Sequence, residues 1–185
     1  MADRETAETI IRQLENQGIG VAEGARALYN SKNPSVIAKG LLGLVTIKGG
    51  KQNAAYHIKD LASETGHAIV GMLGENDKLY QRLKKVVEEH PEVVRELLGN
   101  EEYAAYEGTA NATKEFMGHL IGLYLEQWDN INPNTKLKTI GTLIQRMVDW
   151  LYSKLHITNR DYYTARYNAK WTAYNMVKDF MGVNF

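Results

Sequence analysis

The sequence lacks several features that would narrow its function. Its 185 residues include no cysteine and only three prolines. The absence of cysteine excludes disulfides, thiol nucleophiles and thiolate metal sites, and it fits any redox compartment. The formal net charge is zero, with 22 basic and 22 acidic side chains. Because a non-specific binder of nucleic acid normally carries a basic excess, nucleic acid is not an expected partner.

Long hydrophobic runs are also missing. The longest uncharged apolar stretches are residues 40–47 and 116–125, whereas a membrane-spanning helix needs about 18 to 20 apolar residues. Charged side chains between Asp3 and Glu15 interrupt any apolar core that a signal peptide would need. We therefore expect a protein that is cytoplasmic at synthesis, without a signal peptide or transmembrane segment. Its later release from the cell stays open.

Helical patterning is the main feature that is present. Apolar residues recur every three or four positions, and Gly, Asn or Asn-Pro separates the periodic segments. This predicts an all-α fold, an irregular antiparallel bundle of about eight helices that forms a single domain over residues 1–185. The turn at 129–134 is the expected place of any sub-boundary. The expected helices cover residues 4–17, 21–30, 34–48, 53–73, 76–89, 91–99, 100–128 (interrupted near 108), 135–155 and 158–181.

Two of these helices are expected to lie in the core. Residues 116–128 are apolar over more than half of the helix circumference, which is typical of a helix surrounded by neighbours. Gly118 and Gly122, one turn apart, predict a close approach by a second helix. Helix 135–155 carries a narrow apolar stripe that ends in Leu151 and Leu155, with Met147 beside it. Such a stripe indicates a helix packed against the core.

The last helix carries an aromatic stripe. Tyr163, Tyr167, Tyr174, Val177 and Met181 follow a four-and-three spacing, and Trp171 lies beside them. Tyrosine and tryptophan bury a ring while a polar atom stays wet, so they are enriched at interfaces. These six side chains are our predicted contact face. A core helix that packs only within its own chain is an equally good interpretation.

This stripe gives the leading functional hypothesis, a non-catalytic helical module for protein–protein contact. The module is a self-assembling structural component or a small binding or inhibitory protein, and its partner is another protein or a second copy. No Gly-x-Ser-x-Gly elbow, phosphate loop, dinucleotide fingerprint or His-Glu-x-x-His is present. The sequence therefore predicts no catalytic residue, and an enzyme is the less favoured class.

One alternative is a metal or acid/base enzyme that uses histidines and carboxylates on two helices. Carboxylate-rich metal bundles place a Glu-x-x-His on each of two helices. Glu64-x-x-His67 matches this pattern once, but Glu115 and His119 are one residue too far apart to match it again. A single match is expected by chance in a chain with this many acidic residues. No metal or other cofactor is therefore predicted, and these four residues are kept as the candidates of the alternative.

A second alternative is a toxin or effector that inserts helices 34–73 into a membrane. Residues 36–47 are apolar and rich in glycine, and lysines lie at positions 39, 48 and 51. Helices of this kind can lie in a membrane interface. A helix buried through its glycines would have the same pattern, so a membrane partner is less expected than a protein.

Overall fold

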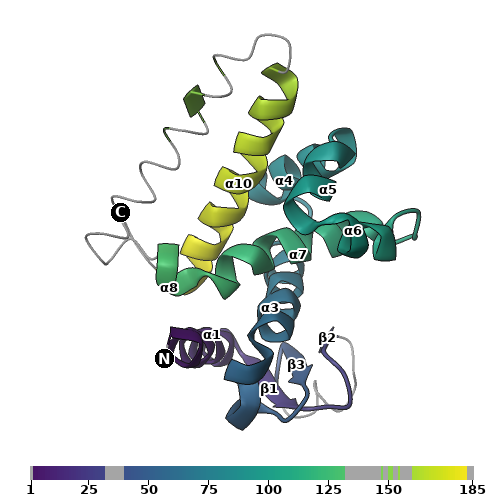
Figure 1. Ribbon diagram of the computed structural model, residues 1–185. Coiled ribbons are helices and arrows are strands. Elements are labelled where there is room, and N and C mark those ends of the chain that lie inside the picture. The colour runs from purple at the N-terminus through teal and green to yellow at the C-terminus, as the bar shows by residue number, and fades with distance from the viewer. Residues whose placement is uncertain are drawn as a thin grey trace.

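A computed structural model describes residues 2–31, 40–131, 147, 150, 151, 154 and 160–182 (Figure 1). The fold is predominantly helical, as the periodicity predicted, and it also contains a small sheet. The elements in chain order are α1 (Ala2–Asn16), β1 (Ile19–Glu23), β2 (Leu28–Asn30), β3 (Gly43–Ile47), the 3₁₀ helix η1 (Lys51–His57), α3 (Ile58–Leu73), α4 (Lys78–Glu89), α5 (Pro91–Leu98), α6 (Asn100–Tyr106), α7 (Ala112–Glu126), α8 (Trp128–Ile131) and α10 (Arg160–Met181).

The three-stranded sheet corrects the helices predicted over 21–30 and 34–48. Its strand order is β1-β3-β2; β1 runs parallel to β3 and β2 antiparallel to it. Burial alternates along β3, with Val45 and Ile47 fully buried and Thr46 less so. This two-residue period belongs to a strand, and the β-branched side chains favour it. Residues 32–39 lie outside the described part of the chain.

The centre of the molecule is the crossing of α3 and α7 (Figure 1). The sheet and α1 lie on one side of this crossing, and α4 and α10 lie on the other. The close approach predicted from Gly118 and Gly122 is confirmed, because a Cβ on Gly122 would lie 3.0 Å from the Cα of Ser63. A Cβ on Gly66 would collide with the backbone oxygen of Gly118. The two backbones therefore touch, which brings their side chains unusually near one another.

The helix ends follow local sequence signals. The Oδ1 atom of Asp77 accepts hydrogen bonds from the backbone N–H groups of Leu79 and Tyr80, at 2.9 and 3.1 Å. This carboxylate caps α4, which begins two residues later than the helix expected over 76–89. The expected interruption near Gly108 separates α6 from α7. The first three residues of the turn expected over 129–134 are helical, because α8 continues to Ile131; residues 132–134 are outside the described part.

One cluster of buried apolar side chains extends from Ala7 in α1 to Met181 in α10. The predicted helix 135–155 is described at only four positions, all of them helical. At two of these, Met147 and Leu151, the side chains are 63% and 43% exposed. The expectation that they pack in the core is therefore wrong. Within the described ranges, no helix has the length and apolar character that crossing a membrane requires.

Candidate metal centre

Three side chains with metal-binding atoms meet where α3 crosses α7. The Nε2 atom of His67 lies 3.2 Å from the Oε2 atom of Glu115, and Nε2 of His119 lies 3.6 Å from the same oxygen. One potential ligand atom from each residue lies within 4.8 Å of the other two. The imidazole of His67 rests directly on Gly118, where a Cβ would displace it. The small residue on α7 thus sets the position of the ligand on α3.

Two of the three separations between the potential ligand atoms are close to the edges of a zinc-type coordination shell. Imidazole and carboxylate ligands bind zinc at about 2.0–2.1 Å, which places tetrahedral ligand atoms about 3.3–3.4 Å apart. The two contacts to Glu115 lie on either side of this value. The two imidazole rings are perpendicular, with centroids 5.3 Å apart. Across the described ranges, this is the one group of three or more such residues with metal-binding spacing.

His119 is the least accessible member of the group. Its side chain is only 10% exposed, and neither ring nitrogen has a hydrogen bond of good geometry among the described residues. Its Nδ1 atom nevertheless lies 2.7 Å from Oε1 of Glu102, a residue of α6. The ring of Tyr106 lies beside the imidazole of His119, with the two ring centroids 5.1 Å apart. Metal-bound histidines usually carry a carboxylate on the ring nitrogen that faces away from the ion. The position of Glu102 matches that arrangement.

Burial keeps both imidazoles neutral, the form that binds metals. Desolvation lowers the pKa of His67 to about 4. Desolvation is also the largest influence on the pKa of His119, which lies below its usual value although Glu102 and Glu115 oppose the shift. The pKa of Glu64 is raised to about 7, first by burial and then by the charge of Glu115. Near neutral pH the crossing therefore offers two neutral nitrogens and one carboxylate, with a second carboxyl group that exchanges its proton.

The group lies at the wall of a pocket of about 780 Å³. His67 and Glu115 line this pocket, and His119 lies behind them. The segment around β2 also lines the pocket, and there the backbone of Tyr29 hydrogen-bonds to Glu64. An ion held by the three residues would therefore have a free position toward the pocket. Further lining residues are Arg26, Leu28, Tyr80, Asn111 and Lys114.

The structure thus places three of the four candidates of the metal or acid/base alternative, Glu64, His67 and Glu115, in the wall of one pocket, and His119 lies beside Glu115. It brings His67, Glu115 and His119 into contact distance, and Glu64 lies on the same wall one turn before His67. A His-Glu-x-x-His helix supplies both imidazoles itself, but in α3 the first position of that pattern is Ser63. His119 of α7 takes the place of the missing imidazole. Sequence reasoning missed Glu102, because no helical spacing connects α6 to α7.

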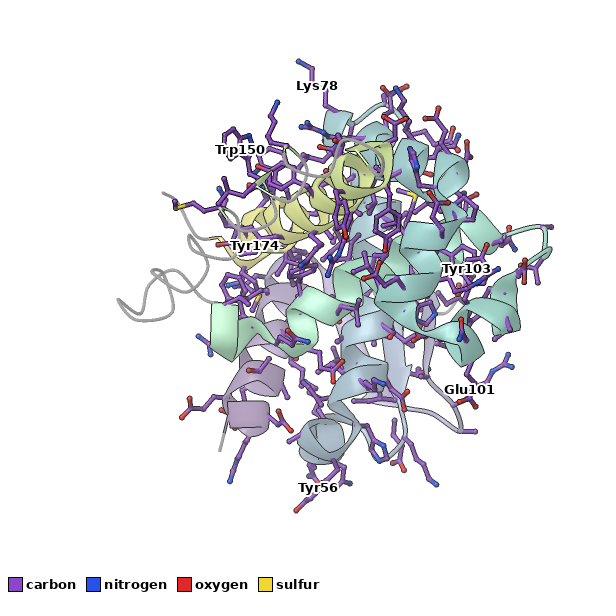
Figure 2. All side chains as sticks on the ribbon, turned by 45° about the horizontal axis from the view of Figure 1, so that its top comes forward. Tyr56, Lys78, Glu101, Tyr103, Trp150 and Tyr174 are labelled. Carbon is purple, nitrogen blue, oxygen red and sulfur yellow. The ribbon has the colours of Figure 1, made fainter. Side chains whose placement is uncertain are left out.

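The predicted contact face divides into two parts. Tyr174, Val177 and Met181 are buried inside the chain, whereas Tyr163, Tyr167 and Trp171 are partly exposed. The guanidinium of Arg82 lies 4.9 Å from the centre of the Trp171 ring. Figure 2 shows the side chain of Tyr174 on α10 and that of Trp150 at the outer edge of the molecule. A role of this face in binding a partner stays a prediction.

The predicted membrane-active segment is not the helix that was expected. Residues 43–47, its apolar centre, form the middle strand of the sheet, with Val45 and Ile47 buried. The second part of the segment is α3, whose apolar side packs against the sheet and α7. Membrane insertion of residues 34–73 would therefore require both elements to leave the core.

Comparisons with known proteins add no functional assignment. No family model, no curated protein and no solved structure matches this chain.

Proposed function

We propose that this protein binds one divalent metal ion of the zinc class through His67, Glu115 and His119. The observation that carries the proposal is the convergence of two partly buried, neutral imidazoles on one carboxylate oxygen, at 3.2 and 3.6 Å. A mixed imidazole and carboxylate site suits zinc and its neighbours in the first transition series. Three protein ligands and a free position are typical of a catalytic or exchangeable ion, whereas structural zinc sites are closed by four ligands.

The burial of His119 is a second observation that supports the proposed metal site. Polar groups in protein interiors are normally hydrogen-bonded, and each exception needs an explanation. Nε2 of His119 is such an exception within the described part of the chain, because Oε2 of Glu115 is 3.6 Å away, beyond ordinary hydrogen-bond length. A metal ion would satisfy Nε2, and it would orient Nδ1–H toward Glu102. The cost of keeping His119 in the interior then has a functional reason.

Titration of the purified protein with Zn²⁺ and Co²⁺ tests this proposal. We expect one equivalent to bind, and a tetrahedral visible spectrum with Co²⁺. His67→Ala and His119→Ala should each weaken binding more than about 100-fold, since even outer partners of a ligand contribute 10- to 100-fold. His90→Ala is the matched control, because His90 pairs with Glu92 at the turn between α4 and α5.

Circular dichroism of each variant separates loss of a ligand from loss of the fold. A wild-type protein that binds no metal would refute the proposal. Equal weakening in His90→Ala and His119→Ala would refute the assigned ligands.

The contact module is a second proposal, and exposed apolar side chains favour it. Met147, Trp150 and Leu151 are 63%, 50% and 43% exposed, and their spacing places them on one side of a helix. Large exposed apolar groups in one place are typical of protein interfaces. Light scattering over a wide concentration range tests whether a second copy binds there. A strict monomer would leave only a different protein as the partner.

A further inference from the structure

The pocket beside the candidate metal centre contains the parts of a hydrolytic site. We propose that the protein hydrolyses acidic acyl compounds, that is esters or amides with a carboxylate group, with Glu64 as the general base. This inference rests on the proposed metal site and goes beyond it, because metal binding alone requires no chemistry. It follows from the placement of Glu64, the open side of the site and the charges of the pocket.

Glu64 lies on the same pocket wall as the proposed ligands His67 and Glu115. It lies one helical turn before His67 on α3, and both residues line the same pocket. The carboxyl group is held by a hydrogen bond from the backbone of Tyr29 in β2. It is not one of the three residues with mutual ligand spacing. Glu64 can therefore serve water at the free coordination position without itself being a ligand.

The number of metal sites favours an acyl substrate over a phosphate ester. Hydrolysis of phosphate esters commonly uses two ions about 3.5–4 Å apart, which stabilise the attacking and leaving oxygens. Within the described ranges, only the one group at His67, Glu115 and His119 has metal-binding spacing. A single ion is sufficient to polarise a carbonyl oxygen and to bind a water molecule.

The pocket is lined by two cations, Arg26 and Lys114, and by three carboxylates, Glu64, Glu75 and Glu115. With a divalent ion bound, the positive charges would exceed the negative ones by one, which favours a substrate with a negative charge. Arg26 enters from the segment before β2, and Lys114 from the first turn of α7. No carboxylate of the described residues forms an ion pair with either side chain. Charged groups at the rim of a site attract ligands of opposite sign. A carboxylate on the substrate would bind there while its carbonyl faces the metal centre.

The proposed hydrolysis needs only the acyl compound and one water molecule as reactants. Glu64 accepts a proton from a water molecule at the free position while the water oxygen forms a bond with the carbonyl carbon. The bond from that carbon to the leaving oxygen or nitrogen then breaks, and Glu64 returns the proton to the leaving group. One water molecule is consumed, and the products are a carboxylic acid and an alcohol or amine.

Two chromogenic esters test the inference on the zinc-loaded protein: the mono-4-nitrophenyl ester of glutaric acid and neutral 4-nitrophenyl acetate. We expect kcat/KM to be several-fold higher for the glutarate ester. Glu64→Gln should lower kcat for it by about 100-fold or more, the usual range for a general base, while zinc affinity stays within a few-fold. Glu75→Gln is the matched control, because Glu75 lines the same pocket beyond the end of α3.

Each outcome has a defined meaning. A protein that binds zinc but hydrolyses neither ester overturns this inference and leaves the metal site intact, whereas a protein that binds no zinc removes both. Full activity in Glu64→Gln, or after zinc is removed by a chelator, excludes Glu64 and the metal as the hydrolytic pair. Preference for the acetate ester, or for 4-nitrophenyl phosphate, overturns the acidic acyl substrate class.

Discussion

The α3–α7 crossing and α10 show how differently polar and aromatic side chains report on function. In α10 the aromatic stripe is prominent in the sequence, yet Tyr174 and Val177 are ordinary members of the core. At the crossing the sequence signal is a single incomplete motif, yet three polar side chains meet there with one of them almost fully buried. Buried polar groups are costly and therefore more informative than apolar surface.

The largest expected effect concerns the backbone contact on which the crossing depends. Gly66→Ala places a methyl group against the backbone oxygen of Gly118, which cannot move aside without separating the helices. We expect a loss of about 3 kcal/mol in the free energy of unfolding, at the upper end of the range for overpacked cores. Urea unfolding measures it.

Gly71→Ala on the same helix is the control for this substitution. Gly71 is exposed, and its Cβ would make an ordinary 3.5 Å contact with the ring of Tyr29. Alanine is the better helix former, so we expect a gain of up to about 1 kcal/mol. If both variants lose stability equally, the close contact is not what distinguishes the crossing.

A second prediction examines the other side of the comparison, the aromatic stripe of α10. Tyr174 is 4% exposed, and its ring packs edge-on against Tyr124 with centroids 6.4 Å apart. Tyr174→Ala should therefore lower the free energy of unfolding by about 3 kcal/mol, as other buried aromatic truncations do. Tyr167 is only partly buried, so Tyr167→Ala should cost less than about 1 kcal/mol.

Light scattering of the same two variants tests the contact-module proposal. If Tyr167→Ala leaves stability unchanged but lowers the mass of an assembly, the exposed part of the stripe is an interface. A monomeric wild-type protein with two equally destabilised variants would instead make the whole stripe core.

A third prediction concerns Glu102, the residue of α6 behind the metal ligands. Glu102→Ala removes the carboxylate that lies 2.7 Å from Nδ1 of His119. Outer partners of this kind contribute about 10- to 100-fold to metal affinity, so zinc should bind more weakly by that factor. Glu101→Ala is the matched control, because Glu101 is its exposed neighbour at the edge of the molecule (Figure 2). Equal affinities in the two variants would exclude Glu102 from the site.

The fold class could be predicted from sequence because helical periodicity is a local property. The sheet could not, because residues 40–47 are a short apolar run that fits a strand and a buried helix equally well. β2 has only three residues, Leu28–Asn30, and it exists because β3 provides its hydrogen-bond partners. Its formation is a tertiary effect without a signal of its own.

The candidate site was predictable in its parts and not in its geometry. Helical spacing aligned Glu64 with His67 and Glu115 with His119, and all four were identified as candidates of the metal or acid/base alternative. The four-helix metal pattern then counted against them, because it requires the same motif on both helices. What spacing could not show is that Gly66 and Gly118 let α3 and α7 touch. That contact, and not the motif, brings His67 and His119 to one carboxylate.

The smallest expected effect uses pH to measure the polar burial at the crossing. The pKa of Glu64 is raised from 4.5 to about 7 in the folded chain, chiefly by desolvation. Between these two pH values the folded state holds more protons than the unfolded state. The free energy of unfolding therefore falls as the pH rises and Glu64 ionises.

Glutamine never ionises and keeps a carbonyl oxygen to accept the hydrogen bond from Tyr29. In metal-free protein, Glu64→Gln should therefore be more stable than wild type at pH 8 by about 1–2 kcal/mol, after allowance for solvent screening. The two proteins should have equal stability at pH 4, and Glu75→Gln should differ from wild type by less than about 0.5 kcal/mol at both values. Since His67 is present in both, its own titration cancels from the difference. A pH-independent difference would mean that Glu64 is solvated. The contrast between costly polar burial at the crossing and ordinary apolar packing in α10 would then fail.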